Sequence, residues 1–359
     1  MHIVKLTQSE YQDYLATQSD YSFLQTPAWG KIKTGWSFEL LGFKTTALIG
    51  VALVLYKSAP IISKYKLAYI PEGPILNWDE FDPAALTLLA EYLKQQNCFL
   101  LKIGPKVMLH RYSNAELKTA LAAADIKNIS ELTADQTKNT NLKSQLAAAG
   151  FTQETASSFG DVQPRYTFEL DLTQTETDLL ASFNQQWRRN IKKAETAGVS
   201  TRIGTISDLA QFHQIYLETA KRDGFAPRSI SYFEKYLTEF GDAAKLYLAQ
   251  HNGKVEAAAI WVAVGDRAWY SYGASSTAGR ELRPSNALQW RMIQDSKAAG
   301  YLIYDLRGIS ASLDSDDPLV GLLNFKLGLG GSAVEWLGEF DLVLNKPIAT
   351  AYALARRFK

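Results

Sequence analysis

Two stretches of the chain carry the same succession of apolar and polar patterns. The first, residues 39–105, has two runs of alternating apolar residues, an aromatic–glycine corner, an amphipathic segment and a last apolar run. The second, residues 245–308, repeats this order. Alternation with a period of two predicts strands, and spacings of three and four predict a helix. The repetition indicates two copies of one mixed α/β unit, which we expect to frame a cleft.

Capping residues predict where several helices begin and end. Asp82-Pro83 places an acidic N-cap before a proline, which predicts the start of a helix. Residues 173–197 read as one strongly helical stretch that ends at Gly198. Residues 230–240 predict another helix. Near the C-terminus, "NFKLGLGG" predicts a glycine-rich loop, and "PIATAYALARRFK" predicts an amphipathic helix with a basic tip.

The composition describes a folded chain with room for two domains. The 359 residues are 47% apolar, enough for sizeable cores. The 38 basic and 37 acidic residues nearly cancel, which disfavours bulk nucleic-acid binding but leaves room for a local basic groove. The N-terminus lacks the apolar run of a signal peptide, and no stretch approaches the roughly 18 apolar residues of a membrane span. We therefore expect a cytoplasmic protein.

Cysteine and histidine, which often ligate metals or take part in nucleophilic catalysis, are few in this chain. Cys98 is the single cysteine, which excludes an intrachain disulfide, and its apolar neighbours predict a buried side chain. The histidines show no metal-ligand spacing, and no Gly-x-Ser-x-Gly motif is present. We expect neither a metal site nor a serine hydrolase.

Five segments form an ordered series along almost the whole chain: "FLQTPAWGKIKTGW", "QPRYTFELDL", "WRRNIKKAETAGV", "SNALQWRMIQDSKAAGYLIYDLRGI" and "NFKLGLGGSAVEWLGEFDLVLN". Each is weak alone, but their order and spacing together resemble the Fem (FemABX-like) family of peptidoglycan bridge-forming aminoacyltransferases. Residues 194–230 show no heptad pattern. The chain is therefore similar to the short members that lack a coiled-coil arm.

The resemblance implies a fold and its division. The fold class is α/β of mixed α+β type, with two tandem GNAT-like domains (the acyl-CoA N-acyltransferase fold) and a cleft between them. The first expected domain comprises residues 1–160 plus 337–359 and lies on the precursor side. The second comprises residues 161–336 and serves both the precursor and the aminoacyl-tRNA.

The resemblance also implies an acyl transfer. An aminoacyl-tRNA would give Gly, Ala or Ser to the side-chain amine on the third residue of the peptidoglycan stem peptide, forming the interpeptide bridge. The acceptor is UDP-MurNAc-pentapeptide or its lipid-linked form, and both remain open. Aminoacyl-tRNA is a co-substrate, and no cofactor is implied. We expect a monomer, with peripheral contact at the inner membrane surface as an open alternative.

The catalytic residues implied by the resemblance are Phe325 and Lys326. Lys326 would stabilise negative charge on the tetrahedral intermediate, and Phe325 would pack on a base or on the aminoacyl end. The alternative interpretation makes Phe325 a core residue and Lys326 an exposed one.

Four residues are implied for precursor binding. Lys33 would contact the phosphates, with Lys31 as the near alternative. If Ser229 caps the following helix, Arg228 and Tyr232 can face one cleft, where a guanidinium fork and a hydroxyl suit phosphate oxygens. Tyr272 matches a tyrosine near the precursor.

Neighbouring residues of the same strand carry further expectations. Alternation places Tyr270 on the same face as Tyr272, and Gly273 indicates a close backbone approach. Tyr270 is expected to pack in the core.

Asp305, a carboxylate in a different, apolar strand, is expected to be a structural partner for a buried cation or a loop amide.

A basic cluster comprises Arg188, Arg189, Lys192 and Lys193 on a helix with one apolar side. Together with Arg356, Arg357 and Lys359 it could face tRNA or a membrane, and a solvated surface is the alternative.

One position departs from the family pattern. Several relatives have Asp-Pro where this chain has Gly104-Pro105, and that aspartate is a candidate general base. The amine would then lose its proton to water, to the leaving ribose hydroxyl, or to another acid such as Glu72. Two alternative functions stay open: another GNAT-type N-acyltransferase, which the missing Q/R-x-x-G-x-G/A loop disfavours, and a catalytically impaired homologue that binds cell-wall precursors.

Overall fold

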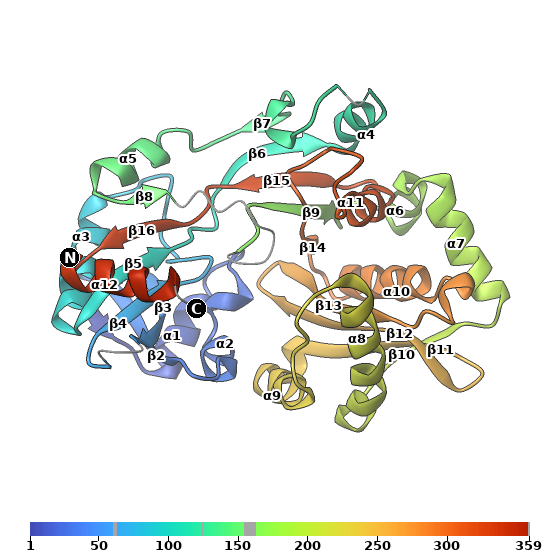
Figure 1. The fold of residues 1–359 in the computed structure, drawn as a ribbon, viewed down its shortest axis with the longest axis horizontal. Coiled ribbons are helices and arrows are strands. Elements are labelled where there is room, and N and C mark those ends of the chain that lie inside the picture. Colours follow the sequence, from blue (N-terminus) through green and yellow to red (C-terminus); the bar gives the residue numbers. More distant parts are fainter. Residues whose placement is uncertain (60–62, 124, 154–162, 358–359) are drawn as a thin grey trace. The chain divides into compact units, whose positions relative to one another are not determined.

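The computed structural model describes residues 1–59, 63–123, 125–153 and 163–357 (Figure 1). The chain forms two compact units. Unit 1 comprises Met1–Arg111, Gln136–Arg165 and Glu335–Lys359, and unit 2 comprises Tyr112–Asp135 and Tyr166–Val334. In the described part of the chain, every helix is too short or too polar to cross a membrane.

Unit 1 contains a mixed sheet with the strand order β1-β2-β3-β4-β5-β16-β8. Its strands are β1 (His2–Lys5), β2 (Ser37–Lys44), β3 (Leu48–Ser58), β4 (Lys66–Ile70), β5 (Cys98–Ile103), β8 (Thr152–Gln153) and β16 (Phe340–Val343). Neighbouring strands are antiparallel except β4 and β5, which are parallel. The helices are α1 (Gln8–Leu15), α2 (Pro27–Ile32), α3 (Pro83–Gln95), α5 (Leu142–Ala148) and α12 (Lys346–Arg357). Strand β6 (Met108–Ser113) pairs with β7 (Gln136–Thr137).

The strands of unit 2 follow the order β10-β11-β12-β13-β14-β9-β15. They are β9 (Tyr166–Asp171), β10 (Ser200–Ile203), β11 (Ala244–His251), β12 (Lys254–Val264), β13 (Arg267–Ser275), β14 (Ile303–Gly308) and β15 (Ser332–Trp336). The helices are α4 (Asn114–Ala123), α6 (Glu176–Ser182), α7 (Gln185–Thr196), α8 (Leu209–Asp223), α9 (Ile230–Phe240), α10 (Pro284–Ala298) and α11 (Val320–Leu327). Figure 1 shows α10 and α8 on opposite faces of the β11–β13 strands.

The internal repeat is present in the structure. In unit 1 three antiparallel strands, β2, β3 and β4, lead through α3 into β5, which pairs parallel with β4. In unit 2 β11, β12 and β13 lead through α10 into β14, which pairs parallel with β13. The prediction of two copies of one α/β unit is therefore confirmed.

Local capping explains the helix starts that were predicted. Asp82 accepts a hydrogen bond from the Ala84 amide, and Pro83 occupies the first turn of α3. The apolar face of α3, including Leu86, Leu89 and Leu93, is buried in the core of unit 1. Helix α9 spans the expected residues 230–240.

Two local predictions are wrong. The single helix expected over residues 173–197 is two helices, α6 and α7, because Phe183 is extended and the Asn184 side chain caps a new helix by accepting from the Trp187 amide. The glycine-rich loop expected at "NFKLGLGG" begins later, because Phe325 and Lys326 belong to the last turn of α11.

The two units divide the chain differently from the expected domains. Residues 112–135 pack with unit 2, although they were expected in the first domain. Backbone hydrogen bonds hold this segment there, from the Ile129 amide to the Ala311 carbonyl and from the Leu313 amide to the Lys127 carbonyl. Ile129 is fully buried in the core of unit 2.

Candidate functional site

Lys326, on α11, is a buried lysine whose Nζ atom contacts the end of β14. Its side chain lies in the last turn of α11, and the residue is 3% exposed. The Nζ atom donates hydrogen bonds to the carbonyl oxygens of Gly308, at 2.6 Å, and Arg307, at 3.4 Å. Burial lowers the pKa of Lys326 to about 7, while the negative charge of Asp305 opposes this decrease. The alternative of an exposed lysine is therefore excluded.

Phe325 joins α11 to the basic helix α7. Its ring lies 4.8 Å from the Trp187 ring, measured between centroids, and its carbonyl accepts from Trp187 Nε1 at 2.8 Å. Gly328, which follows α11, allows this contact, because a Cβ there would lie 2.0 Å from Trp187 Cδ1. Phe325 is only partly buried and packs at the margin of the core.

The predicted precursor-binding residues of unit 2 lie together. The Ser229 side chain caps α9 by accepting from the Tyr232 amide, as expected. The Arg228 guanidinium lies over the Tyr232 ring, 5.4 Å from its centroid. The hydroxyls of Tyr232 and Tyr272 are 2.9 Å apart. The three side chains thus present a guanidinium and two phenols within one group, a combination that suits phosphate oxygens.

Tyr270 does not share a face with Tyr272, contrary to the expected alternation. The pairing of β12 with β13 shifts register between Ile260 and Trp261, so Ser271 is an extra residue in β13. Tyr272 contacts the aromatic residues of α8 and α9, whereas Tyr270 packs against the core of unit 2. Gly273 permits a close approach, but the approaching group is the Tyr270 hydroxyl, which would lie 1.5 Å from a Cβ.

Lys33 of unit 1 lies between two indoles. It is the C-terminal cap residue of α2, and its Nζ atom is 5.3 Å from the centroid of Trp29 and 5.8 Å from that of Trp36. Cation–π contact of this kind orients the ammonium. The neighbouring Lys31 is exposed on α2, so the two lysines have different surroundings.

Gly104 lies beside the side chain of Glu339 and the backbone of Glu72. A Cβ on Gly104 would lie 3.1 Å from Glu339 Cγ and 3.5 Å from the Glu72 amide nitrogen. Glu339 is 5% exposed and accepts from the Tyr69 hydroxyl. Glu72 accepts from the Ser22 hydroxyl. Glu72 was considered from the sequence, whereas Glu339 was missed because nothing in its local sequence connects it with residue 104.

Asp305 belongs to a buried charged group in unit 2. Its Oδ1 atom accepts from the Arg307 amide at 2.6 Å, and its Oδ2 atom lies 3.7 Å from Arg267 Nη1. Arg267 also pairs with Glu169, which lies opposite Asp305 on β9. The prediction that Asp305 is a structural partner is confirmed, because it contacts the buried cation Arg267 and the backbone amide of Arg307 near the end of β14. Burial and the neighbouring Glu169 charge raise the pKa of Asp305 to about 6.

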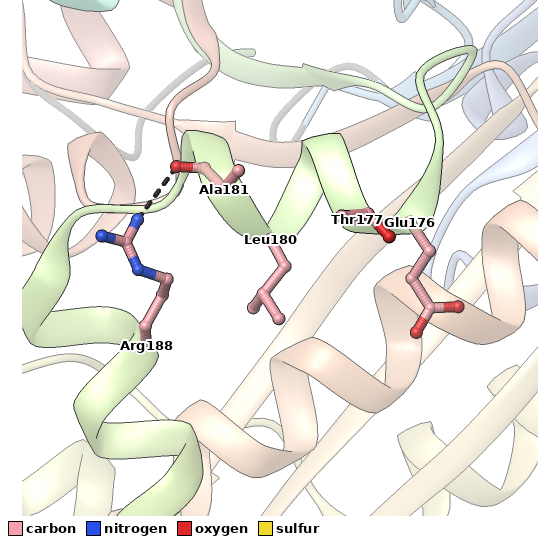
Figure 2. Close-up of a pocket in the computed structure, with 5 residues that line it drawn as sticks. All are labelled: Glu176, Thr177, Leu180, Ala181 and Arg188. Atoms are coloured by element: carbon pink, nitrogen blue, oxygen red, sulfur yellow. Dashed lines mark hydrogen bonds between the residues drawn. The ribbon is translucent and has the colours of Figure 1, made fainter.

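The basic cluster lies on α7, whose opposite side is buried through Trp187 and Ala194. Arg188 donates to the carbonyls of Ala181 and Phe183 and so caps the C-terminal end of α6. Figure 2 shows the bond from Arg188 to the Ala181 carbonyl at one side of a hollow that is also lined by Glu176, Thr177 and Leu180. The volume of this hollow is about 680 Å³.

The other three cations of the cluster, Arg189, Lys192 and Lys193, line a second hollow of about 400 Å³. Lys193 lies 3.6 Å from Glu281, and both side chains are exposed. The side chains of Arg356 and Arg357, and all of Lys359, lie outside the described residues.

Neither the cysteine nor the metal-ligating side chains of the described residues form a reactive site of their own. Cys98 is buried, and burial raises the pKa of its thiol to about 12, as its apolar neighbours predicted. Within the described ranges, histidine, cysteine, aspartate and glutamate side chains form no group of three or more that could hold a metal ion.

Comparisons with known proteins place the chain in a family. The model of the FemAB family matches residues 6–256 and 251–357. Lipid II:glycine glycyltransferase of Staphylococcus epidermidis (strain ATCC 35984) is 24% identical over 427 residues, covering 100% of this chain and 96% of that protein. Lipid II:glycine glycyltransferase of Staphylococcus aureus (strain MRSA252) is 24% identical over 422 residues, covering 97% and 94%.

Solved structures show the same fold. The crystal structure of FemX superposes with a TM-score of 0.81 at 22% identity and covers 98% of this chain and 99% of that chain. A tandem GNAT protein from the clavulanic acid biosynthesis pathway has a TM-score of 0.53 at 11% identity, covering 96% and 98%. The predicted fold class of two tandem GNAT-like domains is thus confirmed. Because the family model matches nearly the full length, the chain belongs to the FemAB family.

Proposed function

We propose that this chain is an aminoacyltransferase that moves an amino acid from aminoacyl-tRNA to the third-residue side-chain amine of a peptidoglycan stem peptide. The supporting observation is its full-length similarity to proteins named lipid II:glycine glycyltransferase. Those names favour glycine over alanine or serine as the first donor to test. They also favour a lipid-linked acceptor over the nucleotide-linked one, and such an acceptor requires peripheral contact with a membrane surface.

The reaction joins an amine to an ester carbonyl. The amine nitrogen attacks the carbonyl carbon, and the tetrahedral intermediate carries negative charge on oxygen. Its collapse breaks the bond between the acyl carbon and the ribose oxygen, which leaves as a hydroxyl and takes up the proton that the amine gives up as the amide forms. An ammonium has three N–H donors. Two donors of Lys326 are directed at the Gly308 and Arg307 carbonyls, and we assign the third to the oxyanion. In a buried site this interaction is much stronger than in water.

The precursor's diphosphate needs cations and hydroxyl donors. The Arg228–Tyr232–Tyr272 group supplies a guanidinium fork and two phenols. Lys33 is a cation of unit 1 that is oriented by Trp29 and Trp36. We assign these four residues to the precursor.

The tRNA acceptor end needs a basic surface. We assign it to Arg189, Lys192 and Lys193, which line one hollow on α7. Phe325, packed on Trp187 of the same helix, would meet the aminoacyl end.

The direct test is a transfer assay. Purified protein is mixed with glycyl-tRNA and either lipid II in vesicles or UDP-MurNAc-pentapeptide, and the acceptor is analysed by mass spectrometry. We expect a mass increase of one glycine residue with lipid II. Absence of transfer with glycyl-, alanyl- and seryl-tRNA on both acceptors would reject the aminoacyltransferase assignment.

Two substitutions test the assigned roles. Lys326→Met should lower kcat by about 100-fold or more, the typical cost of losing one oxyanion donor, with KM for the precursor little changed.

Lys33→Met should mainly raise KM for the precursor. Lys31→Met is the matched control, because this exposed lysine lies on the same helix. Equal effects of the two unit 1 substitutions would contradict the role of Lys33.

A further inference from the structure

A strained turn ends strand β14. Arg307 has a φ of +63°, in the left-handed region that residues with a Cβ disfavour by roughly 1–2 kcal/mol. The pairing of β14 with β9 also shifts register between Asp305 and Gly308. The Asp305 side chain holds this conformation, because its Oδ1 atom accepts from the Arg307 amide at 2.6 Å. A non-glycine residue in this conformation, next to a bulge, requires such a local restraint.

The carbonyls of the same turn hold Lys326. Its Nζ atom donates to Gly308 O and to Arg307 O. The Arg307 carbonyl belongs to a peptide plane that turns directly with the dihedral angles of Arg307, and the Gly308 carbonyl lies one peptide further along the chain. A return of Arg307 to an ordinary φ would therefore displace both acceptors. The position of the Lys326 ammonium therefore depends on the bond between Asp305 and the Arg307 amide.

The charges around Lys326 are mixed. On β14, the charge of Asp305, which is 1% exposed, raises the pKa of Lys326, and the charge of Arg307 lowers it. Behind Asp305 lie Arg267 of β13 and Glu169 of β9, each 2% exposed. Helix α4 packs on α11, and its charged groups are Glu116, which is half-buried, and Lys118, which is exposed. On α7, which contacts α11 through Trp187, the cations Arg189 and Lys192 are directed to an exposed hollow.

We propose that Asp305 is a positioning residue for Lys326. Its carboxylate holds the left-handed Arg307 turn, whose two carbonyls orient the ammonium, and its charge balances that ammonium in a buried site. The link to turnover rests on the proposed aminoacyl transfer, in which Lys326 acts as a cation. The link to the protonation of Lys326 does not depend on any substrate.

Two substitutions in this turn have opposite expected effects. Asp305→Asn keeps an oxygen that can accept from the Arg307 amide but removes the charge, which lowers the pKa of Lys326. Arg307→Gly suits the left-handed conformation and keeps both carbonyls but removes a neighbouring cation, which raises the pKa of Lys326. Because the side chain of Lys326 must be protonated to stabilise an oxyanion, the basic limb of the profile of kcat against pH should shift to lower pH for Asp305→Asn. It should shift up for Arg307→Gly.

The first experiment needs no substrate. The Lys326 side chain is titrated by NMR in lysine-labelled full-length protein, with Lys326→Met used to assign its resonance. We expect a decrease of about one pH unit or more for Asp305→Asn, the size of a nearby buried charge, and an increase for Arg307→Gly. A Lys326 pKa that is the same in all three proteins would overturn the proposal. If Asp305→Asn does not fold, Arg307→Gly decides, because glycine favours the turn.

The second experiment measures kcat and KM against pH with lipid II vesicles and glycyl-tRNA. At pH 8 we expect kcat of Asp305→Asn to fall by about tenfold, the effect of one pH unit, with KM unchanged. A loss of equal size at every pH would indicate a purely structural role and would overturn the proposal. If the wild-type protein transfers no amino acid, the proposed function fails, and the NMR titration still decides the role of Asp305.

Discussion

At Gly104 a neighbouring side chain occupies the space that a family aspartate would take. The closest atoms to a Cβ there belong to Glu339, whose carboxyl group accepts from Tyr69 and lies 4.0 Å from Lys102 Nζ. The local sequence indicates only that a carboxylate is missing. The folded chain brings the carboxylate of Glu339 beside it, from the segment that precedes β16.

A substitution at Gly104 tests this arrangement. Gly104→Asp would put a second carboxylate against a buried one, and we expect a loss of about 2–3 kcal/mol in the free energy of unfolding. The loss should grow as the pH rises, because both groups must then ionise. Gly104→Ala is the control and should cost about 1 kcal/mol, since a methyl group needs only a small shift of Glu339. Thermal unfolding at pH 5 and pH 8 measures both, and equal stability of the two variants at pH 8 would contradict the prediction.

At the scale of elements, two hydrogen bonds join the start of α7 to the end of α11, and we call this contact the α7–α11 lock. The Asn184 amide donates to the Gly328 carbonyl at 2.8 Å, and Trp187 Nε1 donates to the Phe325 carbonyl. The basic helix assigned to tRNA is therefore attached at its first turn to the helix that carries Lys326. Sequence periodicity identified the apolar side of α7 but not its partner, because the contact joins segments that are far apart along the chain.

Gly328→Ala should break this lock. Its methyl group would overlap the Trp187 ring, and we expect a loss of about 2–4 kcal/mol together with reduced turnover. Gly321→Ala is the matched control on α11, because a Cβ there meets no atom within 4 Å. It should leave stability unchanged or raise it by up to about 0.5 kcal/mol, since alanine favours helix. Denaturant unfolding of the two variants provides the measurement, and similar losses in both would refute the lock.

The cations of α7 should separate into two classes. Removing Arg189 and Lys192 together should weaken aminoacyl-tRNA binding and reduce the slope of log Kd against log salt by about 2, one for each phosphate contact. Arg188→Ala should instead lower thermal stability, because Arg188 caps the end of α6. Binding measured at several salt concentrations tests this division. A larger effect of Arg188 than of the pair on the salt slope would reverse the assignment.

At the scale of the whole molecule, burying Lys326 links folding to pH. Its pKa is about 7 in the folded chain and near 10.5 in the unfolded chain, so the unfolded state binds more protons between these values. This contribution makes stability rise with pH, by about 2 kcal/mol between pH 7 and pH 9. Lys326→Met should remove this rise and be more stable than the wild type at pH 7. Urea unfolding across this range measures it, and parallel curves for both proteins would contradict the prediction.

Much of the fold followed from local patterns. The caps at Asp82 and Ser229 gave the starts of α3 and α9 because capping depends on neighbouring residues. The repeated strand pattern predicted the two like units. The Asn184 cap and the Ser271 bulge were missed, since the first interrupts a continuous helical pattern and the second depends on pairing with β12.

The sequence by itself determined the internal repeat, the helices that begin at local caps and the family, because periodicity, capping and motif order are properties of the chain in one dimension. It also brought Arg228, Tyr232 and Tyr272 into one hypothesis. Only the tertiary structure decided the state of Lys326, because its burial, its carbonyl partners and the balancing Asp305 charge come from the packing of α11 against β14, whose Gly308 lies 18 residues before Lys326. Desolvation and charge act through space, so Lys326, for which the sequence left an exposed position open as the alternative, is a buried amine whose pKa is lowered to about 7.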